Sequence, residues 1–281
     1  MRISTTINLH PSAAPDYRAH ILNGIDFHKE AGFDALDFNL AMVTRMGDGW
    51  QPIIEEAAEY VKARGLRFEL SHLPFGFKTG TQEEEDLFMS RVFRAIDAAK
   101  ILGVDYAVAH PNTTTIEAEN YDPKADHDMV IRHLAPIVEY GNKQGVNVVV
   151  ENMRTVESFV PVNRYCGTPE EVCTIADELG IGICWDFGHA HICGLVQSEA
   201  LKYVGKRLRM VHVNDNFGWG DDHIPPFTGN VNWPDAAKGL AAIGYQGLFN
   251  FEVSCRVPSA ARMHFAKMLI ESAKTIIAMM G

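Results

Sequence analysis

The sequence predicts an α/β protein built as a single (β/α)8 barrel, and three observations support this. Short apolar runs alternate with longer amphipathic segments along the whole chain, without a low-complexity stretch or a Pro/Gly/Ser-rich linker. A glycine repeatedly stands between the end of a predicted helix and the next predicted strand. The length of 281 residues is common for one such barrel. We therefore expect one domain over residues 1–281.

Eight segments have the composition of buried strands. Each is a short run rich in apolar and β-branched residues, with turn-forming residues beside it. In chain order they are Ile3–Asn8, Ala35–Asn39, Arg67–Ser71, Tyr106–Ala109, Asn147–Val150, Ile181–Trp185, Arg209–Val213 and Leu248–Phe251. Eight is the number of strands that closes a (β/α)8 TIM barrel.

Amphipathic helices are predicted between many of these strands. They are Pro52–Ala63, Glu84–Leu102, Asp126–Gln144, Pro169–Leu179, Trp233–Ile243 and Ser259–Met280. A glycine suited to the C′ position follows five of them, at Gly65, Gly103, Gly145, Gly180 and Gly244. Thr168, Pro169 and Glu171 are typical of a helix N-terminus, as N-cap, N1 and N3 residues. Strands separated by helices pair in parallel through right-handed crossovers. An open doubly wound sheet is the alternative, but no G-x-G-x-x-G motif follows the first strand.

Composition excludes several classes of protein. The chain has 47% apolar residues, so it is neither disordered nor fibrous. Lys and Arg number 25 against 36 Asp and Glu, and the net charge of −11 disfavours nucleic acid as a partner. The N-terminus lacks the apolar region of a signal peptide, and no uncharged apolar run is long enough to span a membrane. Five cysteines without a C-x-x-C pair suit reduced thiols, so we expect a cytoplasmic protein.

Histidines and carboxylates gather where the predicted strands end. From the third strand to the eighth, every strand delivers at least one of them, and the loop after the seventh strand adds more. The residues are His72, His110, Glu151, Asp186, His189, His191, His212, Asp221, Asp222, His223 and Glu252. Active sites of such barrels form at the C-terminal ends of the strands, so these side chains converge on the expected active-site face.

A divalent metal ion is the simplest explanation of this convergence. Buried carboxylates and imidazoles repel one another or stay unsatisfied unless a cation binds among them. Glu151, Asp186, His212 and Glu252 offer three carboxylates and one imidazole. This ligand set suits Mn²⁺, Mg²⁺ or Co²⁺ and tolerates Zn²⁺, and we expect Mn²⁺ first.

The chain resembles the sugar phosphate isomerase/epimerase branch of the xylose isomerase-like TIM-barrel superfamily, which also contains the AP endonucleases of family 2. The motifs that carry the resemblance are H-x-P-F at His72, H-P at His110, V-E-N at Glu151, D-x-G-H at Asp186, H-V-N-D at His212 and D-D-H-x-P ahead of Trp233. The resemblance implies that Glu151, Asp186, His212 and Glu252 hold a metal. It further implies that the two glutamates act as acid/base groups and that His189 lies near the substrate oxygens.

The chain also departs from the pattern of its relatives. Phe227 stands where the H-x-P-x-G-x-G loop commonly has its first glycine. Residues 210–237 contain no Lys or Arg, whereas epimerases of the tagatose 3-epimerase kind usually place an Arg there to hold a ketose oxygen. Arg154, Arg164 and Arg256 follow the fifth and eighth strands and are candidates for binding an anion such as phosphate, or surface and helix-end cations.

The first functional hypothesis is an isomerase or epimerase of a sugar, a sugar phosphate or a similar small polyhydroxy carbonyl compound. In such chemistry a metal-chelated carbonyl allows a carboxylate to remove the neighbouring proton, which another carboxylate returns. We predict catalytic roles for Glu151, Glu252 and His189. Substrate contacts are predicted for His72, His110, His223, Trp219 and Phe75. The aromatic residues Trp50, Phe75, Phe77, Phe217, Trp219 and Phe227 are expected to form an apolar pocket wall or the contact of a homo-oligomer, with barrel-rim packing as the alternative.

Other reactions stay open. A dehydratase of the inosose or dehydroshikimate type uses the same proton abstraction and then loses a β-hydroxyl. A zinc phosphodiesterase acting at abasic DNA belongs to a different class, and His72, His110, Asp221 and His223 match its trinuclear zinc site. The acidic and aromatic loop after the seventh strand argues against DNA, because a DNA-binding face presents Lys and Arg. A barrel without catalytic activity is a third possibility, and the complete set of strand-end groups gives it no support.

Overall fold

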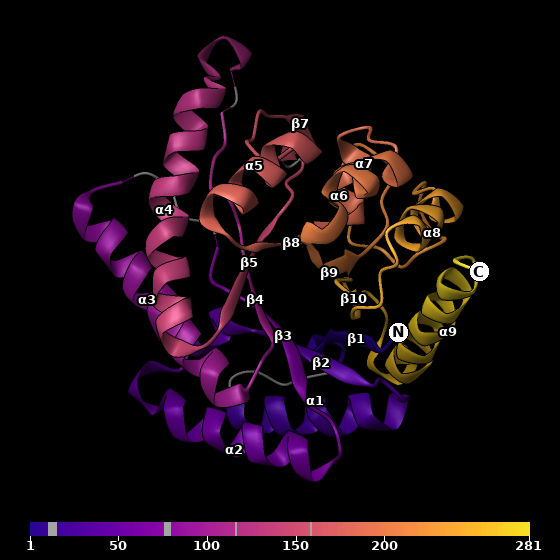
Figure 1. The fold of residues 1–281 in the computed structure, drawn as a ribbon. Helices are drawn as coiled ribbons and strands as arrows, with labels where there is room; N and C mark the ends of the chain where they lie inside the picture. Colours follow the sequence, from indigo (N-terminus) through magenta and orange to yellow (C-terminus); the bar gives the residue numbers. More distant parts are fainter. Residues whose placement is uncertain (11–15, 76–79, 116, 158) are drawn as a thin grey trace.

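The computed structural model describes residues 1–10, 16–75, 80–115, 117–157 and 159–281. Eight parallel strands close into a barrel in the order β1-β10-β9-β8-β5-β4-β3-β2, with helices around the outside (Figure 1). The strands are β1 (Ile3–Thr6), β2 (Ala35–Asn39), β3 (Phe68–His72), β4 (Tyr106–Ala109), β5 (Asn147–Glu151), β8 (Gly182–Asp186), β9 (Leu208–Val213) and β10 (Phe249–Phe251). Each predicted strand overlaps an observed one, and the (β/α)8 barrel is confirmed.

The helices are α1 (Tyr17–Ala31), α2 (Trp50–Ala63), α3 (Gln82–Leu102), α4 (Pro123–Gln144), α5 (Pro169–Leu179), α6 (Phe187–Ile192), α7 (Gln197–Val204), α8 (Trp233–Ala242) and α9 (Arg262–Ala278). At the start of α5, Thr168 and Glu171 form the predicted capping box. The five glycines predicted to follow helices all have a positive φ, which glycine adopts without steric cost. The predicted helix from Ser259 begins instead with a short 3-10 turn, and α9 starts at Arg262.

Three helices were not among those predicted, and α1 shows why. Its buried face includes Gly24 and His28 beside Ile21 and Ile25, so the apolar stripe is interrupted in the sequence. Gly24 is needed there because a Cβ atom would lie 3.2 Å from the carbonyl oxygen of Ile7. Helices α6 and α7 have only six and eight residues, which is too short for a periodic pattern to stand out. A short antiparallel pair of strands, β6 (Val156–Glu157) and β7 (Val160–Pro161), also follows β5.

An apolar cluster fills the inside of the barrel below the strand ends. It consists of Ala35, Leu70, Val108, Val149, Cys184, Met210 and Leu248. Alternate residues of a strand point to the same side, so the residues two positions further on also face inward. Those residues include His72, His110, Glu151, Asp186 and His212. The alternation along each strand therefore stacks two layers inside the barrel. The apolar cluster forms the lower layer, which we call the apolar floor, and the polar residues form a layer above it at the strand ends.

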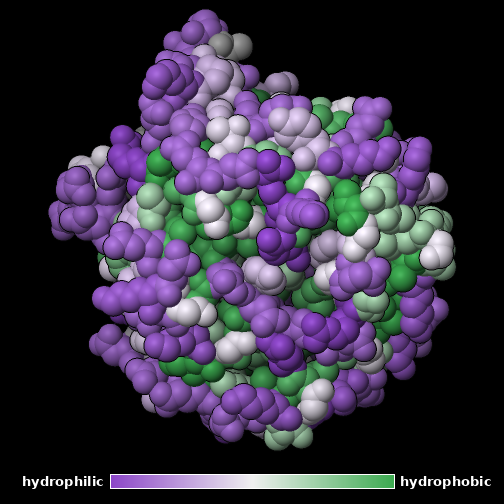
Figure 2. Space-filling model, viewed as in Figure 1, coloured by the Kyte–Doolittle hydropathy of each residue, from purple (hydrophilic) through white to green (hydrophobic). Residues whose placement is uncertain are grey.

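A second, larger core packs between the outside of the strands and the surrounding helices. Hydrophilic side chains spread over most of the face seen in Figure 2, with smaller hydrophobic areas between them. Among the described residues, no helix is both long and apolar enough to cross a membrane.

Candidate active site

The strand-end residues predicted from the sequence meet at the C-terminal end of the barrel. His72, Glu151 and Asp186 are the last residues of β3, β5 and β8, and His212 lies near the end of β9. Asp186 and His212 are direct partners in the parallel pairing of β8 with β9. The strand register therefore brings residues distant in sequence to one level of the barrel.

Glu151, Asp186, His212 and Glu252 form the inner group. One ligand atom from each of the four lies within 4.8 Å of those of the others. The Nδ1 atom of His212 is 3.2 Å from Glu151 Oε1 and 3.0 Å from Glu252 Oε2. Glu151, Asp186 and His212 are fully buried, whereas the side chain of Glu252 is 27% exposed. Glu252 is thus the member of the inner group that faces the barrel mouth.

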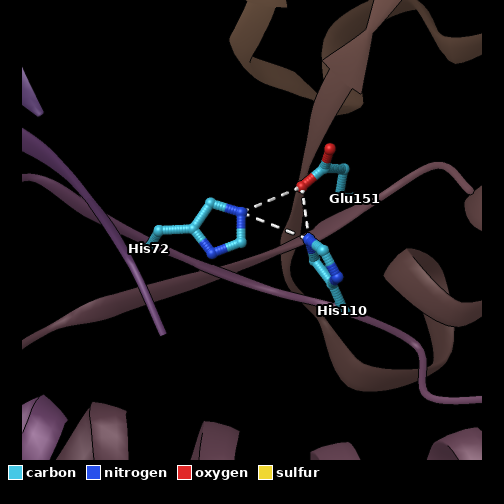
Figure 3. A group of neighbouring side chains, drawn as sticks. All are labelled: His72, His110 and Glu151. Atoms are coloured by element: carbon cyan, nitrogen blue, oxygen red, sulfur yellow. Dashed lines mark hydrogen bonds and ion pairs between the residues drawn. The ribbon is translucent and has the colours of Figure 1, made fainter. Parts of the chain in front are cut away.

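His72 and His110 form a second group with Glu151 (Figure 3). The Nε2 atom of His110 lies 3.0 Å from Glu151 Oε2, and that of His72 lies 3.5 Å from the same oxygen. The two Nε2 atoms are 3.2 Å apart. Phe75 packs against both rings, stacked on His110 at 4.9 Å between centroids and edge-on to His72 at 5.4 Å. Glu151 therefore belongs to two groups at once.

His189, Asp221 and His223 form a third group. Asp221 Oδ1 is 3.6 Å from His189 Nε2, and Asp221 Oδ2 is 3.2 Å from His223 Nε2. The loop after β5 adds Arg154, whose Nε atom is 2.9 Å from Asp221 Oδ2. Burial opposes a charge on His223, but Asp221 and Glu252 outweigh it and raise the pKa of His223 to about 10.

Two asparagines that the sequence analysis did not single out hold Asp186 in place. Asn152 accepts a hydrogen bond from the Asp186 backbone N–H at 2.7 Å, and the Asn214 side chain donates to Asp186 Oδ2 at 2.6 Å. Gly188 leaves room for this arrangement, since a Cβ atom there would lie 1.9 Å from Asn214 Oδ1. The signal was present in the sequence, as the N of V-E-N and of H-V-N-D and the G of D-x-G-H.

The loop after β9 is organised by the buried carboxylate of Asp215. It accepts hydrogen bonds from the backbone N–H groups of Phe227 and Val231 and from the indole of Trp233. Phe227, which replaces a glycine common in similar loops, has a φ of 69°. The phenylalanine therefore keeps the left-handed backbone that favours glycine, at a cost in conformational energy.

Imidazoles and carboxylates balance one another in the site. Burial by itself raises the pKa of Glu252, but the nearby His212 holds the pKa of this carboxyl well below its usual range. Burial likewise opposes a charge on His189, yet Asp186 and Asp221 outweigh it and raise the pKa of His189 to about 9. His189 and His223 therefore supply positive charge to the carboxylates around them, whereas burial lowers the pKa of His110.

The inner group fits a divalent cation. Glu151 Oε1 and both ring nitrogens of His212 are buried and make no hydrogen bond of good geometry within the described part of the chain. Buried polar atoms without partners are costly unless another species satisfies them. Three carboxylates and one imidazole are donors that Mn²⁺, Mg²⁺, Co²⁺ and Zn²⁺ accept.

Not every residue named from the sequence joins this centre. Trp219 is 61% exposed and stacks on Phe217 at 5.7 Å between ring centroids. His191 contacts the side chain of Asn216, and Trp50 packs against the outer core. Arg164 contacts Thr114, and Arg256 donates to the backbone oxygen of Asp222. Phe77 lies outside the described residues.

Sequence comparison finds several relatives, and two of them have cyclitol or sugar chemistry in their names. An uncharacterised protein of Methanocaldococcus jannaschii is 26% identical over 224 residues, which cover 73% of this chain and 74% of that protein. An inosose isomerase of Bacillus licheniformis is 26% identical over 56% of this chain and 57% of its own length. A fructoselysine 3-epimerase of Shigella flexneri is 22% identical over 76% of this chain and 75% of its own length.

Solved structures share the fold over the full length. A D-tagatose 3-epimerase-like protein superposes with a TM-score of 0.76 at 20% identity, covering 100% of both chains. A 3-keto-D-glucoside 4-epimerase from E. coli has a TM-score of 0.74 at 19% identity and covers 99% of each chain. The family profile described as xylose isomerase-like TIM barrel matches residues 25–274. Since this match covers most of the sequence, the chain belongs to the xylose isomerase-like TIM-barrel family.

Proposed function

We propose that this protein is a divalent-metal-dependent isomerase or epimerase of a small sugar, a sugar phosphate or a related polyhydroxy carbonyl compound. The observation that carries the proposal is the placement of two glutamates around one imidazole, since Glu151 and Glu252 both lie within 3.2 Å of His212 Nδ1. Relatives named as an inosose isomerase and a fructoselysine 3-epimerase support the same class of reaction.

The ligand set of the inner group supports a single ion held by Glu151, Asp186, His212 and Glu252, with Mn²⁺ expected first. Such an ion supplies a Lewis acid that polarises a carbonyl group and makes the neighbouring C–H bond more acidic. Asn152 and Asn214 fix the position of Asp186. This arrangement keeps the carboxylate orientation constant during turnover.

Proton transfer is assigned to the two glutamates. Glu252 faces the mouth, and its low pKa keeps it ionised at neutral pH, so it can accept a proton from a substrate carbon. Glu151 contacts the same His212 Nδ1 through Oε1 and His110 through Oε2, and it is assigned the return of a proton to the substrate. The two carboxylates thus provide the acid and the base that epimerisation at one carbon, or isomerisation between two neighbouring carbons, requires.

The remaining polar groups are assigned to substrate oxygens. The ring of His189 is oriented by the backbone oxygen of Asn152, which lies 2.8 Å from Nδ1. His72, His110 and His223 are proposed to bind hydroxyl groups, and Phe75 and Trp219 to line the mouth. Phe75 has the stronger support, because it packs directly on two of these histidines.

Substrate α-proton exchange tests the proposal. The Mn²⁺-loaded protein is incubated in D₂O with ketoses, ketose phosphates and inososes, and exchange is followed by NMR. Glu151→Gln and Glu252→Gln should each lower the exchange rate by roughly 10²- to 10⁴-fold while most of the metal is retained. Glu170→Gln on the exposed first turn of α5 is the matched control and should exchange at the parent rate. Exchange near the parent rate in either site variant would show that this glutamate is a ligand only.

Dehydration of the same substrates is a second outcome of this chemistry, and loss of a β-hydroxyl in the NMR product spectrum would identify it. A zinc phosphodiesterase is the candidate from another class. It is favoured by one observation, since the described residues form four overlapping groups of possible ligands at this end of the barrel. Incision of an abasic duplex with three bound zinc ions would establish that alternative.

We also propose that the protein works as one domain in the cytoplasm without a nucleic-acid partner. All five cysteines are free, which suits a reducing compartment. The net charge of −11 gives little counterion release on DNA, so no salt-dependent binding to duplex DNA is expected. Assembly into a homo-oligomer stays a prediction.

A further inference from the structure

The third group differs from the inner group in its balance of charge. Asp221 is its single carboxylate, and three nitrogen-bearing side chains already surround it. Arg154 Nε lies 2.9 Å, His223 Nε2 3.2 Å and His189 Nε2 3.6 Å from its oxygens. The inner group has three carboxylates and one imidazole, and within the described residues no Lys or Arg forms an ion pair with them.

The guanidinium reaches this place from another part of the barrel. Arg154 follows β5, whereas Asp221 lies in the loop after β9. A terminal nitrogen of Arg154 also lies 3.4 Å from His189 Nε2, so the arginine contacts two of the three members of the third group. The side chains of Arg154 and Asp221 are each only 18% exposed, which limits the screening of their interaction by water.

We propose that the Arg154 guanidinium takes the place of a metal ion in the third group, so that the group of His189, Asp221 and His223 is a metal site closed by an arginine. A guanidinium stays protonated under all ordinary conditions, so its charge cannot be removed to admit an ion. A divalent ion bound to Asp221 would share one carboxylate with Arg154 and would be repelled by it at short range. Metal is therefore excluded from the third group and confined to the other groups of possible ligands, each of which contains Glu151 or Glu252.

This inference has a consequence for the reaction. It rests on the proposed function only in assigning Arg154 to the substrate side of the site. Residues 210–237 contain no Lys or Arg, and Arg154 brings a fixed positive charge to that loop from the loop after β5, which is separated from β9 by β8. A substrate oxygen beside His189 would then be held by N–H donors rather than by a further ion. A three-ion phosphodiesterase mechanism is incompatible with this arrangement.

Metal content measures the proposal directly. The parent, Arg154→Met and Arg154→Lys are loaded with Mn²⁺, freed of excess ion and analysed for manganese per chain. Arg154→Met removes the charge and should bind about one ion more per chain than the parent, because Asp221 and its two histidines become available. Arg154→Lys keeps the charge and should match the parent. Electron paramagnetic resonance should show coupling between neighbouring Mn²⁺ ions only in Arg154→Met.

A second substitution identifies where the additional ion binds. His223→Ala should leave the metal content of the parent unchanged and should remove the additional ion when combined with Arg154→Met. Equal metal content in the parent and Arg154→Met would overturn the proposal. So would a loss of one ion from the parent on His223→Ala, since it would show metal beside the arginine. Arg154→Gln replaces Arg154→Met if the latter does not fold.

Manganese content and α-proton exchange are independent measurements. A parent protein that exchanges substrate protons but already carries an ion at the third group would overturn this inference and leave the proposed function intact. If the metal content follows the expected pattern but no substrate exchanges its α-proton, this inference stands and the proposed function is overturned.

Discussion

Two completely buried histidines in different regions of the molecule have pKa values that are shifted in opposite directions. His28 lies on the inner face of α1, and burial lowers its pKa to about 4. His212 is equally buried at the end of β9, but the Cys184 thiol and two glutamates beside it outweigh burial and raise its pKa well above the ordinary value. Burial keeps an imidazole neutral unless carboxylates accompany it. The catalytic face is therefore a region where polar groups are buried together.

The largest effect is expected from removing the imidazole of the inner group. His212→Ala deletes one of the four proposed ligands and removes the nitrogen that contacts both Glu151 and Glu252. Metal affinity should fall by more than the roughly 10- to 100-fold typical of an outer-sphere substitution. Titration with Mn²⁺ followed by calorimetry measures this change. Unaltered affinity would place the ion elsewhere.

A smaller loss is expected when the support of a ligand is removed. Asn214→Ala takes away the hydrogen bond to Asp186 Oδ2 but leaves all four ligands. Metal affinity should fall by about 10- to 100-fold. Asn147→Ala is the control, since Asn147 is exposed at the opposite end of β5 and should bind metal as the parent does. Equal metal affinity of Asn214→Ala and the control would mean that the hydrogen bond from Asn214 to Asp186 does not contribute to metal binding.

The lowered pKa of His28 predicts that the stability of the protein depends on pH. The pKa of His28 is lower in the folded protein than the unfolded value of 6.5, so the unfolded state takes up the proton first as the pH falls. The contribution of His28 to the free energy of unfolding is therefore largest above pH 6.5 and decreases by about 2 kcal/mol between pH 7 and pH 5. Urea unfolding of the parent and of His28→Leu at both pH values measures the difference.

The comparison for His28 is between the pH dependences, not between the absolute stabilities. His28→Leu also loses the contact of Nδ1 with the Gly24 carbonyl oxygen, which changes stability at every pH. The parent should lose more stability on acidification than the variant does. Equal losses would show that the pKa of His28 in the folded protein is not lowered from its unfolded value.

The smallest effect concerns the backbone of the loop after β9. Phe227 has a left-handed backbone and is 47% exposed, so its ring makes a limited contribution to packing. Phe227→Gly should raise the free energy of unfolding by up to about 1 kcal/mol, because glycine adopts this conformation without a steric penalty. Thermal unfolding measures the change. A clear loss of stability would instead mean that the ring is needed against Trp233, its neighbour at 6.3 Å.

The convergence of the strand-end residues could be predicted because it follows from one rule. Residues two positions beyond the apolar filling of each strand point inward at the same end, so motif positions are enough to bring His72, Glu151 and Asp186 together. The destination of Arg154 could not be predicted in this way. It depends on a contact between two loops of irregular backbone, whose course no periodicity encodes.

Helix α1 could not be predicted from the sequence for a related reason. Gly24 packs against Ile7, and His28 is buried on the same face of the helix, so tertiary contacts override the sequence pattern there. The same limit applies to Trp219. Its position in an aromatic loop suggested a pocket wall, but whether a large side chain turns inward or outward is decided by the loop conformation.

The apolar floor closes the barrel interior directly below the candidate active site. Leu70, Val149 and Met210 belong to a filled layer below the polar groups, and a layer packed at the density of a protein interior has no passage for water or a sugar. Whatever enters must leave by the same opening. Under the proposed function, substrate and product therefore share one opening, and each turnover begins only after the previous product has departed.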